Sequence, residues 1–168
     1  LFGHNITAEL LHRFLKAIPK RFKLLEFSLN HQNVFSIEDF TLYQRSNFVL
    51  PLSIFYENLY SGYRENIRRN IKKSVQFGCV VKIGIDISEV IRIAKHSAAK
   101  YSADDFARFE KLFAFLNKEG KAETYGILSA QGELLASCAF LFSHNRSYYL
   151  LVGNHPNGRT IGASHALI

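Results

Sequence analysis

A glycine-containing stretch near the end of the sequence combines residue types and spacing that could bind an anionic ligand. It runs from Gly153 to Ser164 (GNHPNGRTIGAS), between a β-rich run and a segment that we expect to be helical. A turn of this kind presents unpaired backbone N–H groups at a helix N-terminus, where they and the helix dipole attract phosphate. Small residues also let the backbone approach a ligand closely. The alternative is a plain connection between strand and helix, in which the glycines serve only the turn geometry.

A basic segment, residues 63–73 (YRENIRRNIKK), is the second candidate. On a helix, its apolar side chains would recur every four residues and face the core: Ile67, Ile71 and Val75. The basic side chains would then form a row of three and a further pair: Arg64, Arg68 and Lys72, then Arg69 and Lys73. Such a surface could hold a diphosphate or an RNA backbone. The alternative is a solvated helix face whose charges favour solubility.

The remaining reactive side chains form no recognisable catalytic or metal-binding motif. The seven histidines include no HExxH pair and no CxxC spacing occurs, so no metal site is expected. His155 and His165 lie near the glycine-containing stretch, but a structural or exposed role is expected for each. Tyr148 and Tyr149 point to opposite faces of an expected strand, so at most one of them lines a cleft. No residue stands out as a general base, and the catalytic residues stay unassigned.

The elements that must position these residues begin with a helix capped by Thr7 and stopped by Pro19. The pattern then predicts a strand at Lys23–Asn30 and an extended stretch at Phe40–Leu52. Ser53 is expected to cap a short helix that leads into the basic segment. The first third of the chain is therefore expected to mix helix and strand.

The rest of the chain predicts a helix at residues 65–77 that ends at Gly78, followed by a strand at residues 80–85. Ser88 is expected to cap the next helix, whose inward residues are Val90, Ile91 and Ala94. Ser102 and Asp105 resemble a capping box before a helix with an apolar face: Phe106, Phe109, Leu112, Phe113 and Leu116. Three β-rich runs with hairpin-length breaks then predict an antiparallel meander: Glu123–Ser129, Leu134–Phe142 and Ser147–Val152.

The composition is that of a globular protein, with 168 residues of which 48% are hydrophobic and 21% charged. The net charge of +7 favours an anionic partner such as a nucleotide, a phosphorylated carrier, a nucleic acid or a membrane surface. Cys79 and Cys138 are expected to be buried free thiols in a reducing compartment. No apolar run is long enough for a membrane span, and we expect a cytoplasmic protein of which this sequence is an excerpt. The oligomeric state is not indicated.

The order of these parts resembles the layout of GNAT acyltransferases. Arg159–Ser164 (RTIGAS) resembles the Arg/Gln-x-x-Gly-x-Gly/Ala pyrophosphate loop of that superfamily, with Ser164 at its last position. Residues 63–73, followed by Phe77-Gly78, resemble the S-x-N-x-R-R-x-I-R-K-A-x-x-x-G helix of Fem-type (FemAB-like) peptidyltransferases and their bacterial relatives. The runs GELLA at residues 132–136 and YYLLVG at residues 148–153 are similar to the meander of that group.

This resemblance implies a mixed α/β (α+β) fold, with a GNAT-like sheet whose antiparallel meander is flanked by helices. It assigns residues 1–50 to the C-terminal part of a preceding GNAT-like module. Residues 51–168 would be the N-terminal and central part of an acyltransferase module. The same resemblance implies residues that bind the donor, namely Gly153, Asn154, Gly158, Arg159, Gly162 and Ala163, and residues that bind the acceptor or a tRNA, namely Arg64, Arg68, Arg69 and Lys72.

The activity that the resemblance implies is acyl transfer to an amine. The donor would be acyl-coenzyme A, as a co-substrate rather than a tightly bound cofactor, or aminoacyl-tRNA. The acceptor would be a small molecule or a cell-wall precursor. Direct attack within a ternary complex would require the protein mainly to position both substrates and to polarise the acyl carbonyl. The alternative is a non-catalytic module of the same fold that binds an anionic ligand or nucleic acid through the basic helix.

Overall fold

A computed structural model describes residues 6–29, 33–96, 98 and 100–167 of the chain. The chain divides into two compact units, Leu1–Pro51 and Leu52–Ile168. The assignment of these parts to two successive GNAT-like modules stays a prediction.

The first unit has a single helix among its described residues, α1 (Ala8–Lys16). Thr7 caps it as predicted, because its hydroxyl accepts a hydrogen bond from the Leu10 N–H at 3.1 Å. The predicted strand at Lys23–Asn30 is wrong over residues 23–29, and residue 30 lies outside the described residues. Phe40–Leu52 likewise forms no strand. An alternating pattern becomes a strand only with a partner, and the described part of this unit offers none.

The second unit is built on a four-stranded antiparallel sheet in the order β1-β2-β3-β4. Its strands are β1 (Val80–Ile83), β2 (Ala122–Leu128), β3 (Leu134–Ser143) and β4 (Arg146–Asn154). The predicted meander is confirmed, and β1 joins it by antiparallel pairing with β2. The β3–β4 turn has positive φ angles at His144 (51°) and Asn145 (54°), which is the geometry of a tight hairpin.

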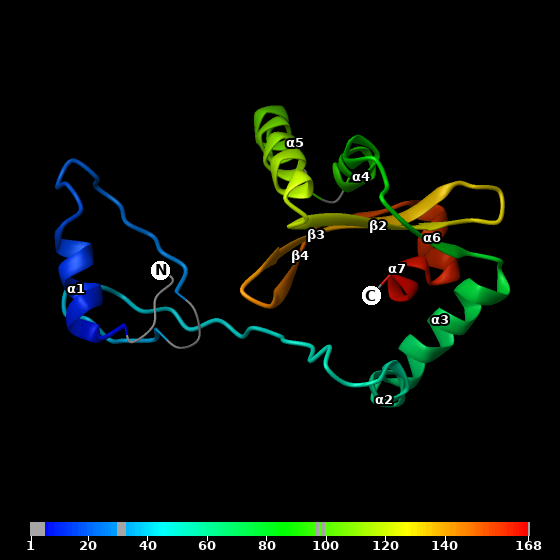
Figure 1. The fold of residues 1–168 in the computed structure, drawn as a ribbon, viewed down its shortest axis with the longest axis horizontal. Coiled ribbons are helices and arrows are strands. Elements are labelled where there is room, and N and C mark those ends of the chain that lie inside the picture. Colours follow the sequence, from blue (N-terminus) through cyan, green and yellow to red (C-terminus); the bar gives the residue numbers. More distant parts are fainter. Residues whose placement is uncertain (1–5, 30–32, 97, 99, 168) are drawn as a thin grey trace. The chain divides into compact units, whose positions relative to one another are not determined.

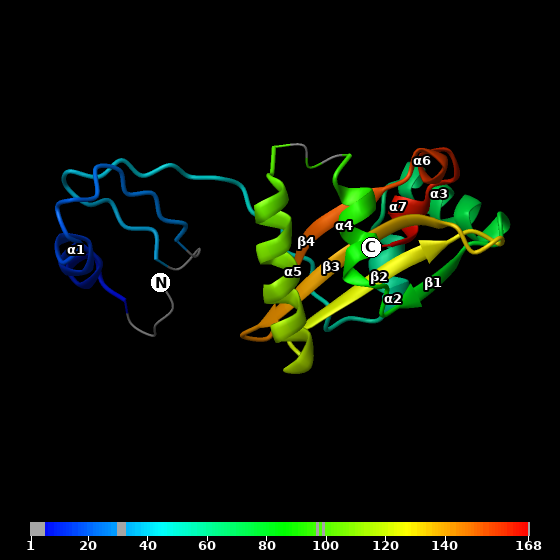
Figure 2. The ribbon, with the colours of Figure 1, turned by 90° about the horizontal axis from the view of Figure 1, so that it is seen from above.

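Helices cover both faces of this sheet, as the edge-on view in Figure 1 shows. One face carries α4 (Ile87–Ala94) and α5 (Ala103–Lys118), which cross the strands when seen from above in Figure 2. The other side holds α2 (Tyr56–Ser61), α3 (Glu65–Gln76), α6 (Pro156–Ile161) and α7 (Ala163–Ala166). The fold class is therefore the mixed α/β (α+β) class that the sequence predicts.

Hydrogen bonds at the helix ends partly match the predicted caps. The capping box of α5 is confirmed, because the Ser102 hydroxyl accepts from the Asp105 N–H while the Asp105 carboxylate accepts from the Ser102 N–H. The predicted cap of α4 is wrong by two residues, since Asp86 and not Ser88 accepts the capping hydrogen bond. The N-cap of α2 is Phe55 rather than Ser53. On α5, Phe106 and Phe113 are buried as expected, but Leu112 is 48% exposed.

A row of small residues lets α4 lie close against the sheet. Gly126, Ser137 and Gly153 are neighbours in the pairing register across β2, β3 and β4. A Cβ on Gly126 would lie 2.7 Å from the Ile85 side chain, and one on Gly153 would lie 2.8 Å from the backbone nitrogen of Ala94. A larger residue at Gly153 would therefore push α4 away from the strands, and one at Gly126 would displace Ile85, which lies just before α4.

Candidate functional site

The glycine-containing stretch is ordered as the end of a strand and two short helices rather than as an open turn. β4 extends to Asn154, and His155 is the N-cap of α6 because its ring Nδ1 accepts from the Asn157 N–H at 3.3 Å. Pro156 fits the first helical position, where no N–H is needed. Gly162, with φ of 77°, joins α6 to α7 in the left-handed conformation. The expected turn between strand and helix is therefore wrong over residues 156–161, which are helical because Pro156 and the His155 cap favour a helix there.

Each glycine in this stretch lies against another part of the protein. Gly158 faces the backbone of Leu135 in β3, where a Cβ would lie 3.1 Å from the carbonyl carbon. Gly162 faces α3, and a Cβ there would lie 2.6 Å from the carbonyl oxygen of Asn70. Gly153 faces the backbone of α4 at Ala94. Close packing of backbone therefore accounts for all three glycines, whether or not any of them also contacts a ligand.

Of the other residues predicted to bind the acyl donor, some lie on the surface and some in the interior. Arg159 is exposed on α6 and Ala163 is fully buried at the start of α7. The Asn154 Oδ1 atom is buried and has no hydrogen-bond partner within the described residues. Among the residues predicted to bind the acyl donor, Arg159 therefore has a side chain that can be changed without disturbing the packing.

The basic helix α3 is confirmed, but its inward face differs from the prediction. Ile67 and Ile71 are half-buried as expected, whereas Val75 is 66% exposed and Ser74 is buried instead. Ser74 is buried, and Asn70 faces Gly162 and His165 at the α6–α7 junction and on α7. Among the predicted basic residues, Arg68 is half-buried and the other three are exposed: Arg64, Arg69 and Lys72.

The structure brings the two predicted sites together through α3 and α7. The Asn70 side-chain Nδ2 lies 3.4 Å from the His165 Nδ1, next to the contact between Asn70 and Gly162. The basic side chains themselves lie on other faces of α3, which a helical step of 100° per residue separates from Asn70. The helix with the predicted acceptor-binding residues, α3, therefore lies beside the helices with the predicted donor-binding residues. The contact is made by the Asn70 backbone and amide group and not by the arginines of α3.

A β-bulge in β4 is a feature that the sequence analysis missed. The partners of Phe140 and Cys138 in β3 are Tyr149 and Val152, so the single residue Ala139 faces both Leu150 and Leu151. A bulge of this kind leaves one residue out of the hydrogen-bond ladder, and bulges are frequent beside active sites. The residue pattern of β4 is uniformly apolar around the bulge, so periodicity offered no sign of it.

Tyr149, directly before the bulge, is in a row of aromatic rings on one face of the sheet. Its ring centroid lies 5.3 Å from that of Phe140, which lies 5.6 Å from that of Tyr125. Burial, with a smaller contribution from the Cys138 thiol, raises the pKa of Tyr149 to about 12. Burial likewise raises the pKa of Cys138 to about 12. At neutral pH, Tyr149 is therefore a hydrogen-bond donor, and Cys138 is not a nucleophile.

An acid and a histidine lie together at the start of α6. The His155 Nδ1 is 3.5 Å from the Glu133 Oε1, and both oxygens of Glu133 lie 3.4 Å from the Asn157 Nδ2. Both His155 and Glu133 are partly exposed. This group therefore places a carboxylate and an imidazole beside the residues predicted to bind the acyl donor. Glu133 was not among the predicted site residues.

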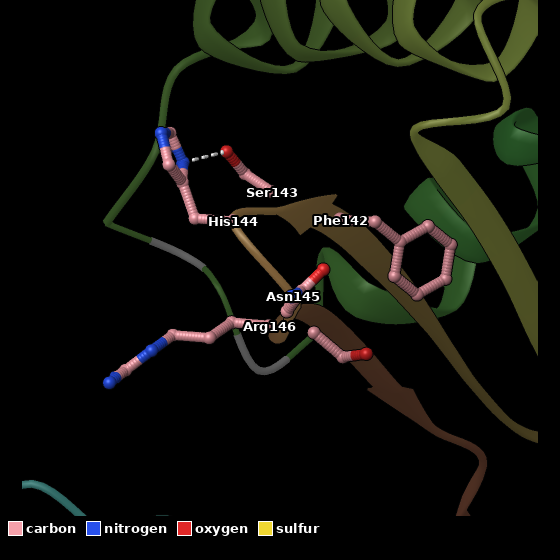
Figure 3. A pocket seen from close by; sticks show the side chains of 6 residues that line it. Phe142, Ser143, His144, Asn145 and Arg146 are labelled. Atoms are coloured by element: carbon pink, nitrogen blue, oxygen red, sulfur yellow. Dashed lines mark hydrogen bonds between the residues drawn. The ribbon is translucent and has the colours of Figure 1, made fainter.

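Two of the hollows in the described part of the second unit lie away from the predicted residues. The β3–β4 hairpin, residues 142–147, lines a hollow of about 300 Å³. In it, the Ser143 hydroxyl and the His144 Nδ1 are 2.6 Å apart, and Arg146 points away from Phe142 (Figure 3). A second hollow of about 430 Å³ lies between the β1–α4 turn, α5 and the start of β2.

The described residues contain no group of three or more His, Cys, Asp or Glu side chains that could hold a metal ion. Within the same part of the chain, no helix is long and apolar enough to cross a membrane.

Comparison with solved structures gives a match to the crystal structure of FemX, with a TM-score of 0.54. The match covers 66% of this chain and 44% of FemX, so the chain spans less than half of that protein. The chain has a distant Fem/GNAT-like fold. Sequence identity to FemX is 12%, so this likeness concerns the fold alone. No protein-family model and no curated protein matches the sequence.

Proposed function

We propose that the chain is part of an acyltransferase that moves an acyl or aminoacyl group from acyl-coenzyme A or aminoacyl-tRNA to an amine. The observation that carries this proposal is the Fem/GNAT-like fold shared with FemX. Fold alone does not determine function, so the site must support the proposal as well. The donor and the acceptor are inferred from the sequence resemblance.

The β4 bulge is the feature of the site that fits this chemistry. When an amine nitrogen attacks an acyl carbonyl carbon, negative charge develops on the carbonyl oxygen before the bond to sulfur or oxygen of the donor breaks. Backbone N–H groups aimed at that oxygen stabilise the charge. Residues 150 and 151 lie where the register between β3 and β4 shifts, and a bulge leaves one residue outside the hydrogen-bond ladder. The amine loses its proton to a base or to the leaving group of the donor.

A second candidate function is the non-catalytic module, and the contact at Gly162 favours it. The backbone of Asn70 covers the position at which the predicted pyrophosphate loop would approach its ligand. A protein that keeps the fold but not the donor site would bind its anionic partner through the exposed basic residues of α3.

The experiment is a thermal-shift and acyl-transfer screen against coenzyme A, acetyl-coenzyme A, aminoacyl-tRNA and UDP-linked cell-wall precursors. A ligand that binds only the native state raises the Tm by mass action. Transfer of a labelled acyl group to an amine would support the proposal. Absence of both stabilisation and transfer with every donor would contradict it and favour the non-catalytic module.

The informative variant is Arg159→Ala, because Arg159 is exposed and its loss leaves the packing unchanged. Loss of a charged contact to a donor phosphate weakens donor binding by about ten-fold. Arg146→Ala, in the β3–β4 turn, removes the same charge from an exposed position and serves as the control. Equal donor affinity in both variants would remove Arg159 from the donor site.

A further inference from the structure

The segment that leads into the sheet, residues 52–77, combines exposed apolar side chains with unpaired positive charge. It comprises α2, α3 and the residues before and between them, and we call it the basic–aromatic segment. α2 and α3 lie on the same side of the sheet as α6 and α7 and farther from the strands (Figure 1). The outer surface of this side is therefore formed by the segment.

Positive charge dominates this segment. It contains five basic side chains and only two acidic ones, Glu57 and Glu65. Within the described part of the chain, none of the five has an acidic partner: Arg64, Arg68, Arg69, Lys72 and Lys73. By contrast, Arg92 on the opposite side of the sheet is neutralised by Glu89 at 2.8 Å. An unpaired row of this kind favours an anionic partner.

Exposed apolar side chains occur in the same segment as these charges. Phe55 is 80% exposed and Leu52 is 67% exposed, just before α2. On α3, Val75 is 66% exposed and occupies the same flank as the row of Arg64, Arg68 and Lys72. The α2 helix buries none of its residues. Exposed apolar residues next to basic residues are the pattern of a segment that lies in a membrane interface.

The kind of apolar residue decides between a lipid surface and a nucleic acid. Bases stack on successive free aromatic rings, but the three tyrosines of this segment pack on one another. The Tyr60 ring centroid lies 5.9 Å from that of Tyr56 and 6.1 Å from that of Tyr63. The Lys73 Nζ lies 6.0 Å from the Phe77 ring centroid, which leaves Phe55 as a single exposed ring rather than a stacking platform. Leu52 and Val75 are aliphatic and offer a base no stacking surface. Aliphatic side chains and positive charges together match the acyl and phosphate layers of an anionic bilayer.

We propose that the basic–aromatic segment docks the protein on an anionic membrane surface, with Phe55 and Leu52 entering the interface and Arg64, Arg69 and Lys72 contacting lipid phosphates. This inference is independent of the proposed acyl transfer.

The experiment measures sedimentation of the protein with vesicles made of equal parts phosphatidylglycerol and phosphatidylcholine, and with vesicles of phosphatidylcholine alone. Binding is expected only to the anionic vesicles and is expected to weaken as salt is added. The triple variant Arg64→Gln, Arg69→Gln, Lys72→Gln should bind about 100-fold more weakly, from about five-fold for each charge near the surface. Phe55→Ser should weaken binding by about ten-fold through lost apolar burial.

The opposite side of the sheet supplies matched controls. Arg108→Gln, Lys111→Gln, Lys118→Gln removes three charges from exposed positions of α5, and Phe115→Ser removes a phenylalanine that is 64% exposed there. Both controls should stay within about two-fold of the unchanged protein, because charges far from the contact are screened. Circular dichroism establishes that all variants remain folded.

Three outcomes would overturn the proposal. One is equal binding to neutral and anionic vesicles, and another is equal loss of binding in the α3 triple variant and its α5 control. The third is binding of a single-stranded RNA oligonucleotide without binding of anionic vesicles, which would assign the basic residues to nucleic acid.

Discussion

The carbonyl oxygen of Asn70 in α3 lies 2.6 Å from the point where a Cβ on Gly162 would stand, so these two residues hold α3 against the α6–α7 junction. The same glycine has a φ of 77°, a conformation that disfavours any side chain. Gly162 therefore satisfies two structural demands, and a loss of function after its replacement does not by itself indicate a phosphate site.

Gly162→Ala is expected to destabilise the protein by about 2–4 kcal/mol, from backbone strain and from the clash with Asn70. Gly132→Ala is the control, because Gly132 has a φ of 84° but no atom lies within 4 Å of the point where its Cβ would stand. Gly132→Ala should lower the free energy of unfolding by about 1–2 kcal/mol, from backbone strain alone. Urea unfolding of both variants measures the difference. Equal losses would mean that α3 does not press on Gly162.

The small-residue row under α4 leads to a second prediction. Ile93 is 1% exposed and its side chain contacts Gly153 in β4. Ile93→Ala should lower the free energy of unfolding by about 2–5 kcal/mol, because it opens a cavity between α4 and the sheet. Val81→Ala, at a position in β1 that is 62% exposed, should change it by no more than about 0.5 kcal/mol. Similar effects of both substitutions would contradict the described packing of α4.

The sequence predicted those parts of the fold that are determined by local pattern. The meander follows from alternation and turn residues, and the α5 capping box follows from Ser102 and Asp105 three residues apart. The strand at Lys23–Asn30 failed because a strand also needs a partner, which the residues of the run do not specify. Tertiary contacts override local preference in such segments.

The sequence pattern also could not predict the contacts of the candidate site. A glycine in the pattern RTIGAS is compatible with a bound phosphate and equally with a helix that crosses it, because both require the absence of a Cβ. The contact between Asn70 and Gly162 shows the packing of the helix, which the sequence pattern alone does not reveal. The β4 bulge at Leu150 and Leu151 was missed because its residues are apolar on both sides of the irregularity.

The α5 cap leads to a pH-dependent prediction. Hydrogen bonds from the Ser102 backbone and side chain hold the pKa of Asp105 below its ordinary value of 3.8. A folded-state pKa below the unfolded value stabilises the protein above the unfolded pKa, and this contribution is lost as the pH falls through the folded pKa. The difference in Tm between the unchanged protein and Asp105→Asn should therefore be constant near neutral pH and shrink below about pH 4. A difference that grows on acidification would contradict this cap.

Tyr149 provides the last prediction. Its pKa is raised to about 12, because burial beside Phe140 and Cys138 disfavours the phenolate. In an absorbance titration of the eight tyrosines, Tyr149→Phe should leave the curve unchanged below about pH 11 and remove one phenolate equivalent above it, provided that circular dichroism shows the protein still folded. Loss of absorbance at lower pH would mean that the partial burial of Tyr149 beside Phe140 does not disfavour the phenolate. A loss confined to the high-pH part of the curve would confirm that Tyr149 stays a neutral hydrogen-bond donor beside the bulge throughout the physiological range.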